Sequence, residues 1–448
     1  MNYPIWEVPI LGGSWIIGII SCIHIFISHF AVGGGMYFAV SEWIAHKNND
    51  HDMYAYLKKH TQFFLLLTTV AGAVTGVAIW WTISLVNPDG IETLIQTYTL
   101  GWACEYVFFV AELAIIFVYY YSWGRVSRDT HLKLAIAYAI SSIMTLVIIN
   151  GILTYMLTPG GWLESRYWFD GFFNETYWPS LIIRLLIMAA IAGMYSLVTA
   201  ARLPQGEFRS RMLRHATKWF LPVFVIGPIV GFWFANNIPP NVLNTIGGGI
   251  QASGVGNFSI LARALYLSVI LSGTITIFSF VGPYLNPKGF SYKTALMFLM
   301  CGLLVTSISE WSREMLRKPF VVYDHLYSNG LRVDDIAHIN EIGYLNHSKW
   351  SPKDATPMQV GRHMYVGQCL ACHTRNGYRS MTKLIGERNE KSIRAFLGTL
   401  HESDLSKNPY GRIMPPVVGT DEELDGLALY LSTFNAEEET AEIANAAE

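Results

Sequence analysis

The pentapeptide Cys-Leu-Ala-Cys-His at residues 369–373 is the stretch whose residue types and spacing point most directly to chemistry. Two cysteines separated by two residues and followed at once by histidine form the attachment pattern of a c-type haem. The thiols of Cys369 and Cys372 would bond to the haem, and the His373 imidazole would take one axial position on its iron. Met414 follows His373 by 41 residues and is predicted as the second axial ligand, because a thioether raises the redox potential.

The alternative interpretation is a zinc or redox Cys-x-x-Cys pair that happens to precede a histidine. A structural zinc site takes four ligands at paired spacings, and the neighbouring His363 and His401 show no such pairing. The motif therefore favours one covalent haem c, with the zinc or redox interpretation as the competing one.

The composition places this motif in a membrane protein. Of the 448 residues, 52% are hydrophobic and only 14% are charged, whereas soluble domains have about 25% charged residues. The formal net charge of -2 gives no electrostatic basis for binding nucleic acid. Cys22, Cys104 and Cys301 lie in apolar segments and are interpreted as packing residues. We predict an all-α fold, in which a polytopic membrane helix bundle carries a small α-helical domain.

Apolar runs close to the roughly 20 residues that a membrane span requires recur along the first two thirds of the chain. We predict eight spans, at about 14–44, 61–86, 99–123, 132–157, 177–201, 217–236, 258–284 and 291–316. The connections after the first, third, fifth and seventh spans hold thirteen Lys and Arg residues, whereas the N-terminus and the other connections hold only Arg166. Because positively charged connections stay in the cytoplasm, both termini are predicted on the outer, periplasmic side of a bacterial inner membrane.

The chain is predicted to divide into a bundle, a polar linker, a haem domain and an acidic tail, at 1–316, 317–356, 357–436 and 437–448. A helix at 358–369, the haem motif, Met414 before a proline, and a closing helix at 421–433 follow one another in an order that resembles a class I cytochrome c. The tail has few large apolar side chains and is predicted to be disordered.

Ionisable side chains inside a bilayer are costly and indicate function by default. The predicted spans contain histidines, carboxylates and arginines: His24, His29, Glu105, Glu112, Arg184, Arg263, Glu310, Arg313 and Glu314, with Arg317 at the end of the last span. Iron ligation, proton delivery and neutralisation of haem propionates need such a combination. Two simpler interpretations stay open, since His29 is equally a packing residue and Glu310 and Arg313 are equally a simple ion pair.

Spans one to eight resemble subunit I of the cytochrome bd oxygen reductases. The stretch from His24 to Glu42 follows the first helix of that family without gaps, and Gly-Ala-Val-Thr-Gly at 72–76 resembles its Gly-Val-Ala-Thr-Gly. The resemblance implies that His24 ligates a haem iron within the membrane.

The third span resembles the proton-pathway helix of the same family. Glu112, with the following Leu-Ala-Ile-Ile-Phe-Val, takes the place of one of its two glutamates, whereas the other place falls on Cys104, next to Glu105. The resemblance implies that Glu112 and Glu105 deliver protons.

The end of the last span carries a third likeness. The sequence Glu-Met-Leu-Arg-Lys-Pro-Phe at 314–320 resembles the family's Glu-x-x-Arg-Gln-Pro-Trp. The resemblance implies that Glu314 ligates a high-spin haem b and that Arg317 belongs to its positive surroundings. Two intramembrane haems are expected, with His24 and Glu314 as iron ligands and with haem d as an alternative to haem b for one of them.

The chain also departs from the family pattern. Arg184 and Leu265 fall at the histidine and methionine positions that hold the family's low-spin haem b, and the connection at 237–257 is short where the family has a quinol-binding loop. These departures argue against a low-spin haem b and against a quinol site.

The leading hypothesis is a bd-like terminal oxidase subunit that passes electrons from a periplasmic haem c to intramembrane haems that reduce O2. The alternatives are an electron-transfer subunit of a larger respiratory complex that does not reduce O2, and a membrane-tethered cytochrome c. The expected partners are a second bd-like membrane subunit, membrane lipid and an electron donor, either a cytochrome c or a respiratory complex.

Overall fold

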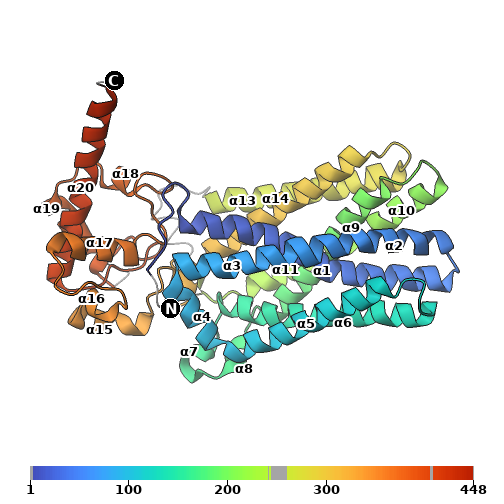
Figure 1. Ribbon diagram of the computed structural model, residues 1–448, viewed down its shortest axis with the longest axis horizontal. Helices are drawn as coiled ribbons and strands as arrows, with labels where there is room; N and C mark the ends of the chain where they lie inside the picture. Colours follow the sequence, from blue (N-terminus) through green and yellow to red (C-terminus); the bar gives the residue numbers. More distant parts are fainter. Residues whose placement is uncertain (1–3, 241, 244–259, 404–406, 447–448) are drawn as a thin grey trace.

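The computed structural model describes the chain except for residues 1–3, 241, 244–259, 404–406 and 447–448. A bundle of long helices forms one part of the molecule, and a smaller helical domain lies at one end of it (Figure 1). Eight helical segments among the described residues are long and apolar enough to cross a membrane. The predicted all-α fold and the predicted number of spans are therefore confirmed.

The helices of the bundle are α1 (Gly12–Lys47), α2 (His51–Leu65), α3 (Ala73–Val86), α4 (Pro88–Thr97), α5 (Thr99–Tyr121), α6 (Arg128–Tyr155), α7 (Trp162–Ser165), α8 (Trp168–Phe172), α9 (Tyr177–Ala200), α10 (Glu207–Lys218), α11 (Leu221–Asn236), α13 (Ile260–Ser279) and α14 (Tyr292–Leu316). The π-helical segments η1 (Leu66–Gly72) and η2 (Phe280–Leu285) continue α2 and α13. Short polar side chains begin several helices, since Asp50, Ser127 and Ser291 each accept a hydrogen bond from the backbone N–H three residues later.

Helix α1 is the central element of the bundle and packs against α3, α6, α9 and α14. The rings of Phe30, Tyr37 and Phe38 on this helix are fully buried, and Phe30 stacks on Tyr195 of α9 with ring centres 3.9 Å apart. The 36 residues of α1 give a length of about 54 Å at 1.5 Å per residue. This exceeds the hydrocarbon thickness of about 30 Å, so the helix reaches beyond the bilayer.

The segment at 317–356 is more ordered than its composition indicated. It contains a hairpin of β1 (Phe320–Val322) and β2 (Leu326–Tyr327), paired Phe320 to Tyr327 and Val322 to Leu326, followed by η3 (Val333–Asp335), α15 (Ile336–Ile342) and α16 (Tyr344–His347).

Polar contacts attach this segment to one end of the bundle. Arg166 binds Asp334 at 3.0 Å, Lys349 binds Glu92 at 2.8 Å, and the Asn87 side-chain amide donates to the backbone of Ser328 at 3.1 Å. The linker is predicted to lie on the outer surface of the membrane part, and these contacts place the segment on one end of the bundle.

The C-terminal domain consists of α17 (Pro357–Gln368), α18 (Met381–Ile385), α19 (Glu390–His401) and α20 (Asp421–Ala446). The edge of the Tyr365 ring on α17 meets the Phe434 ring on α20, with centres 5.4 Å apart. Helix α20 continues to Ala446 and points away from the domain (Figure 1). That the tail at 437–448 is disordered stays a prediction.

The N-terminal end of α1 and the C-terminal domain lie at the same end of the bundle, and the connections rich in Lys and Arg lie at the other end (Figure 1). An even number of spans requires this arrangement of the two termini. That the end with the C-terminal domain faces the periplasm stays a prediction.

Candidate functional site

The haem motif follows the last turn of α17. Cys369 and Cys372 are both free thiols, and burial raises the pKa of the Cys369 thiol to about 12. The His373 ring places Nδ1 3.0 Å from the carbonyl oxygen of Arg379. This contact requires Nδ1 to donate, which leaves Nε2 for a metal, and burial lowers the pKa of His373 in favour of the neutral, metal-binding imidazole.

The Met414 segment is held against the same motif. Gln368, directly before Cys369, donates its amide to the carbonyl of Val418 and accepts from the Val418 N–H, both at 2.8 Å. Cys369 and Met414 pack against one hydrophobic core. Two free thiols, an imidazole with an open Nε2 and a thioether thus belong to one small domain, and this donor set fits a covalently bound haem.

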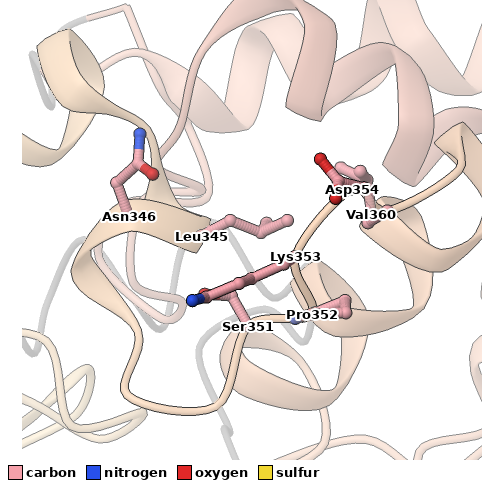
Figure 2. Close-up of a pocket in the computed structure, with 8 residues that line it drawn as sticks. Leu345, Asn346, Ser351, Pro352, Lys353, Asp354 and Val360 are labelled. Carbon is pink, nitrogen blue, oxygen red and sulfur yellow. The ribbon is translucent and has the colours of Figure 1, made fainter.

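In the described part of the chain no three His, Cys, Asp or Glu side chains come together as a metal site. A surface hollow of about 630 Å³ lies between the end of the 317–356 segment and the start of α17 (Figure 2). Its lining residues are Leu345, Asn346, Ser351, Pro352, Lys353, Asp354, Ala355 and Val360. They include none of the haem-motif side chains, so this hollow is not the haem site.

The haem motif contacts the beginning of α1. Ser14 donates its hydroxyl to the carbonyl oxygen of Ala371, which lies between the two cysteines, at 2.5 Å. The Tyr378 N–H donates to the carbonyl oxygen of Ile10 at 2.8 Å. The rings of Trp15 and Tyr378 meet edge to face with centres 5.6 Å apart. The C-terminal domain is therefore attached to the first helix of the bundle by the loop that contains the predicted haem motif.

His24 lies on the same helix, ten residues after Ser14, or about 15 Å along the helix axis. Its Nδ1 lies 3.2 Å from the Gly72 carbonyl oxygen and 3.1 Å from the Thr75 hydroxyl. Gly72 is the last residue of the π-helical η1, a type of segment that is frequent at functional sites. A Cβ at Gly76 would lie 3.0 Å from His24 Cε1, so this glycine makes room for the ring.

The hydrogen bonds of His24 leave one ring nitrogen open. Since Nδ1 must donate to the Gly72 carbonyl, Nε2 is free to act as the predicted iron ligand. His29 differs, because its Nδ1 contacts the carbonyl of Ile25 in its own helix at 2.5 Å and the ring is buried. The structure therefore favours the packing interpretation of His29.

Glu314 lies in a chain of charges along the end of α14. Arg313 donates to Glu310 and to Glu314, both at 2.9 Å, and Arg317 forms an ion pair with Glu314. The Glu314 side chain is nevertheless 41% exposed, so its carboxylate is accessible for a further ligand. Cys22, two residues before His24, is hydrogen-bonded to Ser307 of α14, which holds the two predicted ligand helices together.

Arg184 joins this charged group from α9, with Nη1 3.9 Å from Glu310. Arg184 Nε and Arg313 Nη1 are buried and have no hydrogen-bond partner in the described part of the chain. Buried donors of this kind are expected to have a further hydrogen-bond acceptor, and a haem propionate would fit. Leu265, at the other departure from the family pattern, is 45% exposed, and most of the short connection at 237–257 lies outside the described residues.

The predicted proton-pathway residues lie on one face of α5. Glu112 is buried and accepts hydrogen bonds from Tyr138 at 3.0 Å and Thr145 at 3.4 Å. Glu105 is half-buried, two helical turns away, whereas Cys104 is exposed. The one-residue shift from the family pattern thus leaves the acid, and not the thiol, on the Glu112 side of the helix.

The structure also reveals polar residues that the sequence did not single out. Glu42 and His131 form a fully buried pair, and Gln368 and Ser14 hold the haem motif. The only sequence feature that could have indicated the pair was the ionisable character of Glu42 and His131 near the ends of two predicted spans. Nothing in the sequence indicated that these two helices bring them together.

Comparison with known proteins supports the family resemblance. The family model of cytochrome bd terminal oxidase subunit I matches residues 14–240, which is 227 of the 448 residues. Among solved structures, the bd oxidase from Geobacillus thermodenitrificans matches with a TM-score of 0.59 and 16% identity, covering 69% of this chain and 87% of that one. A comparison with curated proteins found no significant match.

The family match covers just over half of the chain, and the structural likeness shows the same fold. Glu314, Arg317 and the C-terminal domain lie beyond the matched residues. Bd-type oxidases contain haems b and d and a second membrane subunit. This chain belongs to the cytochrome bd terminal oxidase subunit I family and is a multi-pass membrane oxidoreductase subunit of the oxygen-reducing type.

Proposed function

We propose that this subunit takes electrons through its C-terminal domain and passes them directly into the bundle, without a quinol site. The observation that carries the proposal is the contact between Ser14 and Ala371, because it joins the peptide between Cys369 and Cys372 to the helix that bears His24. The bound haems supply the electron transfer and the reduction of O2.

The side chains of the chain have distinct roles in this proposal. Cys369 and Cys372 hold the haem c covalently, with His373 and Met414 at its iron. His24 and Glu314 each hold one iron in the bundle, at the end nearest the C-terminal domain.

The positive and acidic groups complete the assignment. Arg317 fixes the Glu314 carboxylate, and Arg184 and Arg313 offer their free N–H groups to propionates. Glu112 and Glu105 move protons toward the bundle haems. Arg184 also takes the place of the low-spin haem ligand, which is consistent with electrons arriving from the C-terminal domain instead.

The proposed partners are a second membrane subunit and a periplasmic electron donor, either a soluble cytochrome c or a respiratory complex. Large apolar side chains on α3 and α5 are exposed, among them Val77 at 68%, Trp81 at 64% and Val107 at 64%. Such surfaces are stable only against lipid or another apolar surface. They support a membrane position with room for a second subunit beside α3 and α5.

The test is O2 consumption by the purified complex with a reduced soluble cytochrome c as donor. We expect turnover that Cys372→Ser abolishes together with the haem c absorption, while the bundle haems stay intact. Full turnover in the C372S complex would contradict electron transfer through the C-terminal domain. No turnover with quinol, but turnover with the cytochrome donor, would support the absence of a quinol site.

A further inference from the structure

A second acid–base group is buried at the Lys- and Arg-rich end of the bundle. Glu42 of α1 and His131 of α6 have only 1% and 0% of their side chains exposed, and Glu42 Oε1 lies 2.6 Å from His131 Nδ1. Tyr119 of α5 donates its hydroxyl to Glu42 Oε2 at 2.7 Å. A pair buried this deeply is a weak source of stability, because the cost of desolvation offsets most of the attraction.

The contacts of this group show how many protons it holds. His131 Nε2 lies 3.1 Å from the carbonyl oxygen of Tyr119, which can only accept, so Nε2 carries a proton. A neutral imidazole then has a bare Nδ1, and a carboxylate has no proton to donate. The contact between Nδ1 and Glu42 Oε1 therefore needs one further proton, which either of the two bases can hold.

The group is connected to the surface on one side. The Tyr54 ring lies 5.9 Å from the His131 ring, and the Arg128 guanidinium lies over Tyr54 at 4.8 Å. Arg128 donates to the exposed His51 at 2.6 Å. Tyr119, Tyr54 and Arg128 are thus the charged or titratable groups that surround the pair from α5, α2 and the start of α6.

On the other side the group is in line with Glu112. Tyr119 follows Glu112 by seven residues on α5, and Tyr138 follows His131 by seven residues on α6. Residues at this spacing share a helix face, about 10 Å apart. The rings of Phe38 and Phe64 lie between Tyr119 and Tyr138. The distance between ring centres is 5.8 Å from Tyr119 to Phe38, 5.0 Å from Phe38 to Phe64, and 5.8 Å from Phe64 to Tyr138.

We propose that Glu42 and His131 form the proton-uptake site of this subunit. A proton leaves the water at the Lys- and Arg-rich end, is held between Glu42 Oε1 and His131 Nδ1, and moves on to the Glu112 carboxylate. The rings of Phe38 and Phe64 separate the two sites and carry no proton, so the proton is held until water enters between them and carries it inward. The overall balance is that O2 takes up four electrons and four protons and yields two molecules of water. The proposal rests on the proposed role of Glu112 and is independent of how electrons arrive.

The test uses the full complex with a chemical reductant, so that a failure of electron transfer through the C-terminal domain does not affect it. Glu42→Gln keeps the size and the hydrogen bonds of the side chain but cannot carry the proton. We expect turnover to fall by about 100-fold, the lower range of what a positioned acid or base contributes. Haem spectra should stay unchanged, and the solvent deuterium isotope effect on turnover should increase. Glu42→Asp should restore part of the rate.

The matched control is Ser41→Ala, because Ser41 is the neighbouring buried residue on α1 and bonds His215 at 2.8 Å, outside the Glu112 face. S41A should keep both the rate and the isotope effect. If E42Q does not assemble with haem, Tyr119→Phe removes only the hydroxyl bonded to Glu42 and should slow turnover with a larger isotope effect. Wild-type turnover in E42Q, or in Y119F where E42Q fails to assemble, with an unchanged isotope effect, would overturn the proposal.

Discussion

Replacing Gly377 with alanine would separate the C-terminal domain from the bundle by a defined amount. Gly377 lies in the loop that follows His373, and a Cβ at this position would be 2.1 Å from the carbonyl oxygen of Ile10. Ordinary contacts begin at about 3.4 Å, so the loop must retreat by about 1.3 Å, the difference between the two distances. The adjacent hydrogen bond from Tyr378 to Ile10, 2.8 Å long, would then break.

The expected size of the effect follows from that bond. A lost hydrogen bond costs about 1 kcal/mol, which lowers the docking equilibrium of the domain by about fivefold. If the contact between Ser14 and Ala371 is lost as well, the total is about 2 kcal/mol, or roughly 30-fold. We therefore expect the rate of haem c oxidation by the bundle to fall by a factor between about fivefold and roughly 30-fold.

The assay is stopped-flow mixing of the fully reduced complex with O2, recording haem c oxidation. The control is Gly398→Ala in α19, where a Cβ meets only the Arg394 side chain at 3.8 Å and alanine is a better helix former than glycine. G398A should oxidise haem c at the wild-type rate. A wild-type rate in G377A, with a normal haem c spectrum, would refute the direct route through this contact.

Further predictions concern the individual ligands and the segment that connects the two parts. Glu314→Ala should remove one high-spin haem b signal from the optical spectrum and leave haem c unchanged, because only one bundle iron loses its ligand. Met414→Ala should lower the haem c potential in redox titration and open the iron to carbon monoxide, because the thioether is lost. Acidification should destabilise the segment around the β1–β2 hairpin. Burial, together with the nearby Arg166, lowers the pKa of His325 to about 4, whereas the pKa of an unfolded histidine is about 6.5. The folded segment therefore binds fewer protons, and its protection against hydrogen exchange should be complete above about pH 6.5 and decline toward pH 4.

Each of these outcomes has a contrary result. An unchanged b spectrum in E314A would exclude Glu314 as a ligand, and an unchanged haem c potential in the Met414 variant would exclude the thioether. For the hairpin, His325→Gln cannot titrate and should show no such pH dependence. Equal loss of protection in the wild type and in H325Q would contradict the assignment to His325.

The sequence was most informative where function required unusual residues in a fixed pattern. The apolar run lengths led to the eight spans, the Cys-x-x-Cys-His motif led to the predicted haem domain, and the charged residues of the last span supported the family resemblance. Each of these signals is local, so it can be read from neighbouring residues alone.

The sequence was least informative about contacts between distant segments. Ser14 and Ala371 are separated by 357 residues, and the Glu42 and His131 pair joins helices whose mutual rotation no local pattern specifies.

The attachment of the haem loop to α1 has a consequence for traffic through the proposed oxidase. One side of the C-terminal domain is occupied by its own chain, through Ser14, Trp15 and Ile10. An external redox protein can therefore meet the domain only on its remaining sides, so in the proposed route electrons would enter and leave the domain through different faces. With the domain fixed to α1, the rate of electron entry would depend on collisions with the donor rather than on movement of the domain.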